Sequence, residues 1–154
     1  MKNEYGFSLI ELLIVVAIIG IIAAIAAPNL IKSRQAANEA SAIGSVRSIG
    51  TSQAAYQSTT GRGDAFATDL ASLNSVGFID NVLSSGNKSG YGFACNGSPT
   101  AGNQPATFDT TAIPQMTGGY GTGNRSFYSN EAYVIFQTAG SLVMTRTTRG
   151  IPIQ

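Results

Sequence analysis

Histidine is absent from this sequence, and Cys95 is its single cysteine. Without histidine, the Ser-His and Cys-His pairs that activate catalytic nucleophiles cannot form. One cysteine can form neither an intrachain disulfide nor a multi-thiolate metal site. The carboxylates after residue 60 are scattered without catalytic spacing: Asp64, Asp69, Asp80, Asp109 and Glu131. We therefore expect neither an enzyme nor a bound metal or other cofactor, and we expect Cys95 to fill space in the core.

Charge is scarce as well, since only 11% of the residues are charged and the formal net charge is +1. Direct binding of nucleic acid would call for a broad basic patch, which this balance does not supply. Arg146 and Arg149 are close together in the sequence, but two arginines give only a small electrostatic term. We interpret them as part of a solvated tail and do not expect nucleic acid as a direct ligand.

What the sequence does contain is an uncharged apolar run from Leu12 to Ala27, directly after Gly6-Phe7-Ser8-Leu9-Ile10-Glu11. Extended to Ile31, the run reaches about 20 residues, or roughly 30 Å of helix, which matches the hydrocarbon core of a bilayer. A signal peptide ends in a cleavage site of small residues, whereas here an amphipathic helical pattern follows. We expect a retained membrane-spanning helix.

Glu11 lies inside this expected span. A carboxylate in a membrane costs a few kcal/mol and usually persists only with a partner or a function. An ordinary single-pass anchor with Glu11 near a headgroup is the plain alternative. The cost of the buried charge favours a functional role for Glu11.

The leader ending in Gly6 and the segment FSLIELLIVVAIIGIIAAIAAPNL resemble the type IV pilin family, closely from Gly6 to about Tyr56. The resemblance is to type IVa-like major pilins and their pseudopilin relatives. It implies that a prepilin peptidase cleaves between Gly6 and Phe7 and methylates the new amine of Phe7. It also implies a homopolymer assembled through Phe7 and Glu11 by an inner-membrane platform and a motor ATPase, with the subunit held in the membrane beforehand.

On this basis the chain divides into a leader (1–6), a transmembrane or filament-core half of a helix (7–31), an amphipathic half (32–59), and a loop with a β-rich head (60–154). The fold class is α+β, with the long helix packed against a small antiparallel sheet of about four strands. Many family members close a C-terminal loop with two cysteines. This chain has one, so packing and hydrogen bonds must hold that region.

The amphipathic half carries a stripe of mostly small residues that we expect to face the head: Ala36, Ala40, Ile43, Val46, Gly50 and Ala54. Glu39 and Arg47 project near this stripe, so they either pair with the head or a neighbouring subunit, or extend into water. We expect the helix to end near Thr59–Gly61. Gly20 and Pro28 should loosen it within a filament, because glycine is a weak helix former and proline removes a backbone donor.

The head pattern predicts a short helix at 68–76 capped by Thr68, and strands at 91–95, 107–113, 126–128 and 132–136. The stretch 142–148 could add an edge strand or form the tail. Residues 118–123 are glycine-rich, but without a following Lys-Ser/Thr they indicate a flexible surface loop rather than a phosphate site.

Function is therefore expected in assembly. The leading hypothesis is a structural subunit of a type IV pilus for adhesion, twitching motility or DNA uptake. The subunit would start in the inner membrane and end in a filament on the bacterial surface. The alternatives are a minor pilin or a pseudopilin of a type II secretion system. Major secretion pseudopilins usually carry an acidic calcium loop near the C terminus, and residues 140–154 contain no acid.

Overall fold

The computed structural model describes residues 6–148 and 150–153, so the first five residues of the expected leader and Arg149 lie outside the described residues. The chain divides into two compact units, Met1–Ser33 and Arg34–Gln154. Helix α1 (Leu9–Ser58) contributes to both. Its end at Ser58 agrees with the predicted end near Thr59–Gly61.

The described part of the first unit is the start of α1. This helix contains a stretch long and apolar enough to cross a membrane, and none of its most apolar 18-residue window is buried. The helix runs without a break across Gly20 and Pro28.

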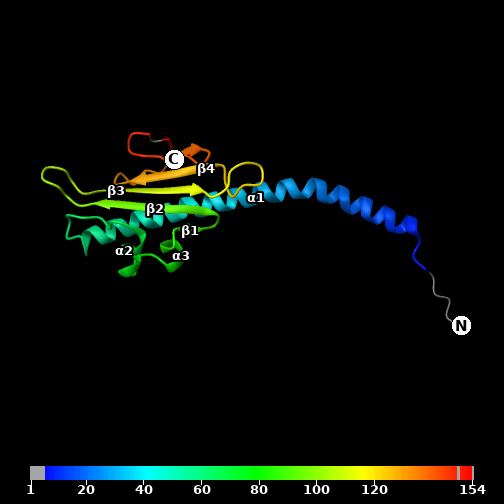
Figure 1. The fold of residues 1–154 in the computed structure, drawn as a ribbon, viewed down its shortest axis with the longest axis horizontal. Coiled ribbons are helices and arrows are strands. Elements are labelled where there is room, and N and C mark those ends of the chain that lie inside the picture. The colour runs from blue at the N-terminus through cyan, green and yellow to red at the C-terminus, as the bar shows by residue number, and fades with distance from the viewer. Residues whose placement is uncertain (1–5, 149, 154) are drawn as a thin grey trace. The chain divides into compact units, whose positions relative to one another are not determined.

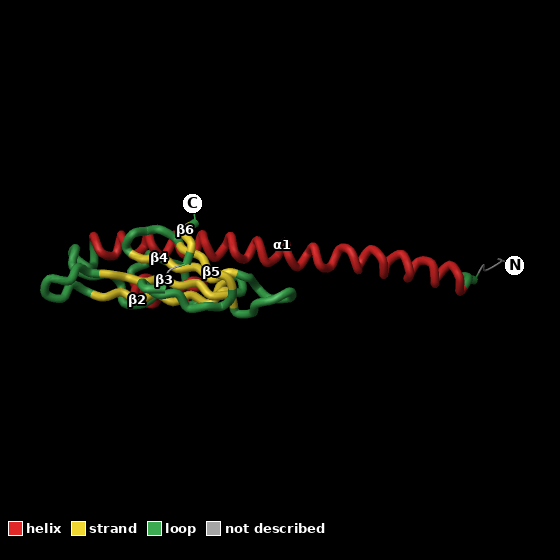
Figure 2. The backbone as a smooth tube through the Cα atoms, turned by 90° about the horizontal axis from the view of Figure 1, so that it is seen from above, coloured by secondary structure: helices red, strands yellow, loops and turns green. Residues whose placement is uncertain are grey.

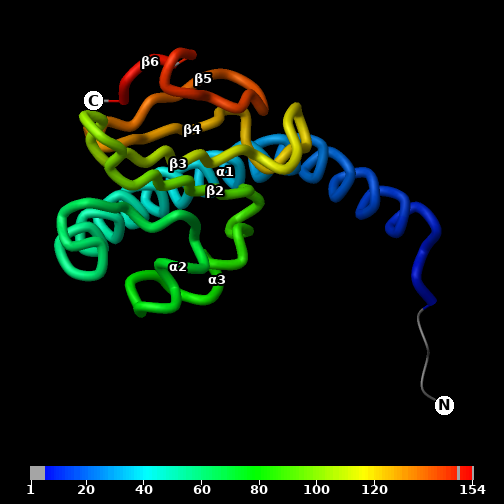
Figure 3. The backbone as a smooth tube through the Cα atoms, turned by 60° about the vertical axis from the view of Figure 1, so that its left-hand side comes forward, coloured from blue at the N-terminus to red at the C-terminus, as the bar shows by residue number. Residues whose placement is uncertain are grey.

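The second unit is built on an antiparallel sheet whose strands follow in sequence order, β1 to β6. The strands are β1 (Asn87–Lys88), β2 (Tyr91–Ser98), β3 (Thr107–Pro114), β4 (Arg125–Asn130), β5 (Phe136–Ala139) and β6 (Ile151–Pro152). They lie along the second part of α1 (Figures 1 and 2). Figure 3 shows the short helices α2 (Leu70–Ser75) and α3 (Asn81–Ser84) beyond the β2 side of the sheet. The predicted α+β fold is confirmed, although the sheet has six strands rather than about four.

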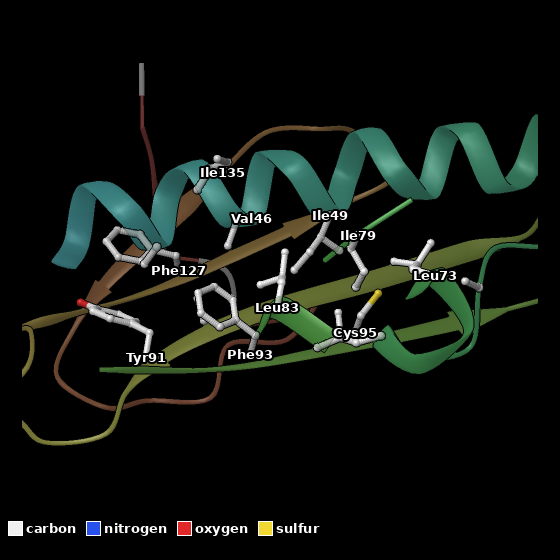
Figure 4. Close-up of a cluster of buried hydrophobic side chains, with 14 residues drawn as sticks. Val46, Ile49, Leu73, Ile79, Leu83, Tyr91, Phe93, Cys95, Phe127 and Ile135 are labelled. Carbon is white, nitrogen blue, oxygen red and sulfur yellow. The ribbon is translucent and has the colours of Figure 1, made fainter. Parts of the chain in front are cut away.

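The core of the head forms between α1 and the sheet. Val46 and Ile49 of α1 point toward Phe93, Cys95 and neighbouring apolar residues of the sheet and the short helices (Figure 4). Cys95 is free and only 4% exposed, which agrees with the prediction that it fills the core. Burial raises the pKa of its thiol, while a hydrogen bond from Gln53 acts in the opposite direction.

The buried face of α1 differs from the predicted stripe. Val46 and Gly50 are buried as expected, but Ala36 and Ala40 are exposed. In their place α1 buries Gln35, Glu39, Ala42, Ser45, Ile49, Ser52 and Gln53. The prediction was wrong because it assumed that only apolar side chains face the sheet, whereas the buried Gln35, Glu39, Ser52 and Gln53 find hydrogen-bond partners in the head.

One strand prediction also needs correction. The stretch 132–136 is not a strand, because the chain turns there, with Tyr133 at φ 57° and its N–H donating to the Asn130 carbonyl. The strand after this turn is β5, which starts at Phe136. The stretch 142–148 forms no strand, which agrees with the alternative that it is part of the C-terminal tail.

The predicted short helix at 68–76 is present as α2, but its cap is Asp69 rather than Thr68. The Asp69 carboxylate accepts a hydrogen bond from the Ser72 N–H at 2.7 Å. This bond is the main cause of a lowered pKa for Asp69. Thr68 instead shares a hydrogen bond with the Ser72 hydroxyl.

Candidate functional site

The junction before α1 places Glu11 in a helix cap. Its carboxylate accepts a hydrogen bond from the Ser8 N–H at 2.9 Å, and the Ser8 carbonyl accepts from the Glu11 N–H at 3.1 Å. A glutamate that reaches back to the residue capping its own helix forms half of a capping box. The positive end of the helix dipole also favours a carboxylate there. Glu11 therefore has a partner inside its own chain.

The predicted cleavage pair lies just outside this cap. A Cβ added to Gly6 would meet no atom of the described residues within 4 Å. The chain's own packing therefore does not explain a glycine at this position. Phe7 is 80% exposed. Both residues are accessible to an external protein.

The helix that follows presents an apolar surface all around. Its large aliphatic side chains between Leu9 and Leu30 range from 47% exposed at Val15 to 83% at Leu9. Aliphatic surface on this scale is unfavourable in water. A bilayer or other copies of the helix can cover it.

Gly20 and Pro28 lie farther along α1 than the Gly6–Glu11 junction. A Cβ at Gly20 would also meet open space. Pro28 lacks the N–H that would pair with a carbonyl one turn earlier, and the Asn29 side chain donates to the nearby Ile25 carbonyl at 3.3 Å. The helix remains continuous at both positions. Their loosening in a filament stays a prediction.

In the head, Glu39 joins α1 to the start of β4. Its carboxylate accepts from the Asn124 N–H at 2.8 Å and from the Arg125 guanidinium at 2.8 and 2.6 Å. Glu39 is 7% exposed, so this pair is largely shielded from water on one side. Pairing with the head was one of two alternatives for Glu39, and the structure supports it. Arg47 is exposed.

The connection between β3 and β4, residues 115–124, is also tied to α1; we call it the β3–β4 loop. The Gln35 amide donates to the carbonyls of Gly118 and Gly121 at 2.8 and 3.1 Å, and the Asn38 amide donates to the Thr122 carbonyl at 2.9 Å. Figures 1 and 3 both show the loop, in yellow, beside α1. The loop lies at the surface as predicted, and two side chains of α1 anchor its backbone.

The C-terminal segment is held by Arg146, which we had interpreted as part of a solvated tail. Its guanidinium donates to Glu131 at 2.5 and 2.8 Å, to Asp109 at 3.1 Å and to the Phe108 carbonyl at 2.8 Å. Tyr128 donates a further hydrogen bond to Asp109. Burial raises the pKa of Tyr128, and the Asp109 carboxylate raises it further. That interpretation was wrong for Arg146, whose partners belong to β3 and the β4–β5 turn.

Packing and hydrogen bonds thus hold the C-terminal segment, as expected for a chain with one cysteine. Met144 is 4% exposed, and the Ile153 N–H donates to the Ile135 carbonyl at 2.8 Å. Arg146 gave no usable signal in the sequence, because its three partners are 15 to 38 residues away.

Two further features of the head suggest no chemistry. A groove of about 470 Å³ lies between β2, β3 and the C-terminal segment, lined by side chains such as Ile113, Val143 and Arg146. Among the described residues, no group of three or more His, Cys, Asp or Glu side chains could hold a metal ion. The candidate functional residues are therefore those of the N-terminal junction, Gly6 to Glu11, and of the exposed apolar helix that follows it.

A junction of this kind on an exposed apolar helix, followed by a β-rich head, is the arrangement expected of a prepilin. Residues 1–27 match the family described as the prokaryotic N-terminal methylation motif. The chain is 42% identical over 86 residues to the type IV major pilin protein PilA of Myxococcus xanthus, covering 56% of this chain and 35% of that protein. It is 59% identical over 39 residues to the type IV wide pilus major component PilA4 of Thermus thermophilus, covering 25% of this chain and 30% of that protein.

The predicted resemblance to type IV pilins is confirmed for the N-terminal region, which matches the methylation motif and is similar to two type IV pilus proteins. The chain spans about a third of the length of the curated relatives that it matches. No solved structure matches it.

Proposed function

We propose that this chain is a structural subunit of a type IV pilus, cut between Gly6 and Phe7 and polymerised through α1. The observation that carries the proposal is the exposed apolar surface from Leu9 to Leu30, with Glu11 as its only charged residue. The names of the two similar proteins, a major pilin and a wide-pilus component, support a pilus rather than a secretion pseudopilus. The acid-free segment 140–154 supports the same choice.

The proposed sequence of events starts with the prepilin in the inner membrane. A prepilin peptidase removes the leader and methylates Phe7, and a platform with a motor ATPase adds subunits to the filament base. During addition, Glu11 exchanges its bond with the Ser8 N–H for the amine of Phe7 on a neighbouring subunit. That amine is the nearest other charge along the processed chain, and pairing relieves the cost of a carboxylate in hydrocarbon. The role is structural, in adhesion, motility or DNA uptake, rather than catalytic.

Mass spectrometry of filaments sheared from the cell surface tests this proposal. We expect an abundant chain beginning with a methylated Phe7. Scarcity in that fraction would favour a minor pilin or a pseudopilin. A surface chain that keeps Gly6 would contradict the proposed processing.

A further inference from the structure

The β3–β4 loop exposes its two largest side chains. Tyr120 is 86% exposed and Met116 is 61% exposed. The loop contains no charged residue. It therefore combines exposed apolar surface with small polar side chains and a backbone that can still reach water.

The loop holds these side chains in place by internal hydrogen bonds as well as through α1. The Thr122 N–H donates to the Met116 carbonyl at 2.8 Å, and the Gly121 N–H donates to the Gly118 carbonyl at 3.0 Å. Gly118 has φ 100°, which side-chain-bearing residues rarely adopt, and a Cβ at Gly121 would come within 2.4 Å of the Met116 carbonyl oxygen. Tyr120 thus projects from a tightly closed turn.

The residue that anchors the loop lies close to the apolar run along the chain. Gln35, which holds the Gly118 and Gly121 carbonyls, follows Ile31 by four residues. Four residues of α-helix span about 6 Å. The headgroup layer on each side of a bilayer is about 5–7 Å thick. With residues 7–31 in the hydrocarbon core, Gln35 follows after only about 6 Å of helix, within reach of the headgroup layer.

The chemistry of this region fits a headgroup layer. Tyrosine is enriched at membrane–water interfaces, where its ring contacts acyl chains and its hydroxyl stays wet. Lys32 and Arg34 follow the apolar run in the sequence and can attract anionic headgroups. Glu39, the single acid between residues 12 and 60, is already paired with Arg125.

We propose that the β3–β4 loop is a second membrane contact of the subunit before assembly, with Tyr120 and Met116 inserted into the headgroup layer. This inference rests on the proposed membrane anchoring of residues 7–31. The contact holds the Gln35 end of the head on the bilayer surface, so that the subunit leaves both its span and this loop contact when it joins a filament.

The absence of tryptophan from the chain allows a direct test. Tyr120→Trp introduces a single indole at an exposed position, and Met116→Trp gives a second probe on the same loop. The full chain is placed in nanodiscs of phosphatidylethanolamine and phosphatidylglycerol whose acyl chains are brominated near the headgroup. We expect indole emission at shorter wavelength than in water and several-fold quenching by bromine for both variants.

Asn103→Trp is the matched control, because Asn103 is exposed in the connection between β2 and β3. The Thr100 N–H in that connection donates to the Asp64 carbonyl, beyond the end of α1 at Ser58. The helix from Gln35 to Ser58 spans roughly 35 Å, so the control probe lies at the other end of the head. Its emission should match that of a water-exposed indole without quenching.

The two proposals fail in different ways. Protein found in nanodiscs, with the probes at positions 116 and 120 emitting like the control, would overturn the loop contact and leave the anchor intact. Protein that does not co-purify with nanodiscs would overturn the membrane anchor of the proposed function, and the loop contact with it.

Discussion

Glu11 shows how a carboxylate can persist in an apolar segment before any neighbour is present. Its carboxylate accepts a hydrogen bond from the Ser8 N–H in the first turn of α1, so it has a partner within one chain. In the proposed assembly step, an intersubunit amine competes with this cap by contributing a full positive charge. On this proposal the charge also serves as a register device, since the exchange requires the two groups to align.

Gly6 is expected to be the processing determinant. The open space around its Cα means that a side chain there disturbs nothing in the chain itself, whereas a peptidase that reads a tight site can exclude any Cβ. Gly6→Val should accumulate as full-length protein in the inner membrane. Intact-mass measurement of membrane fractions checks this, and normal cleavage of the variant would refute it.

The Glu39–Arg125 pair should contribute measurably to the stability of the head. Arg125→Met leaves the buried Glu39 carboxylate with the Asn124 N–H alone, which should lower the free energy of unfolding by about 2–3 kcal/mol. Arg47 is an exposed arginine on α1, the helix that carries Glu39, so Arg47→Met is the matched control. This variant should change the free energy of unfolding by less than about 0.5 kcal/mol. Chemical denaturation in detergent compares the two; equal effects would contradict the assignment.

The Arg146 contacts predict an acid-sensitive C-terminal segment. Burial alone would raise the pKa of Glu131, but the hydrogen bonds and charge of Arg146, together with backbone hydrogen bonds, outweigh it and the pKa is lowered. A lowered folded-state pKa adds stability above the unfolded pKa of about 4.3, and that stability is lost as pH falls through the folded value.

Unfolding free energy measured in detergent from pH 7 to 3 should therefore fall less steeply below about pH 4.5 for Glu131→Gln than for the wild type. At pH 7 the variant should be less stable by about 1 kcal/mol, because the pair is more than a third exposed. Identical pH profiles for the two proteins would show that this pair does not carry the acid response.

At the scale of elements, the two ends of α1 could be predicted from the sequence, but its buried face could not. Its apolar run and the glycines after Ser58 mark both ends in the sequence. The face depends on Gln35, Glu39 and Gln53, whose partners in the head are 14 to 89 residues away. No local sequence pattern reveals such distant partners. The prediction therefore followed a stripe of small residues and assigned the wrong face of α1 to the contact with the sheet.

The strands, too, could be predicted only in part from the sequence. Tyr91 and Thr107 start β2 and β3 as predicted, because β-branched and aromatic residues fit a half-buried pleated surface. The apolar stretch 132–136 has similar composition, yet the turn at Tyr133 places the next strand at Phe136. The junction of Gly6, Phe7 and Glu11 could be recognised from sequence, whereas the cap between Ser8 and Glu11 and the anchored β3–β4 loop required the structure.

The continuity of α1 across Gly20 and Pro28 describes the isolated chain. In a filament, neighbouring groups can pair with carbonyls freed around Pro28, so loosening there has little cost. A filament map should show an interrupted helical hydrogen-bond ladder between these residues, and Gly20→Ala with Pro28→Ala should restore it. An unbroken ladder in the wild-type filament would refute the prediction.

At the scale of the whole molecule, the head has its own core while the first unit has none. Among the described residues, the buried clusters belong entirely to the second unit. Deleting residues 1–31 should therefore yield a soluble monomer with a cooperative unfolding transition, because the helix face and the sheet that form the core remain. Size-exclusion chromatography checks this, and aggregation of the fragment would contradict it.

The most direct test of the whole account is the filament yield of Glu11 variants, measured by immunoblots of sheared surface and membrane fractions. Glu11→Ala should still insert and be cleaved, since losing a charge eases membrane residence, but it should give few filaments. Glu11→Gln should be intermediate, because it keeps hydrogen bonds without the charge. The account predicts cleaved Glu11→Ala subunits retained in the membrane; a wild-type filament yield from this variant would contradict it.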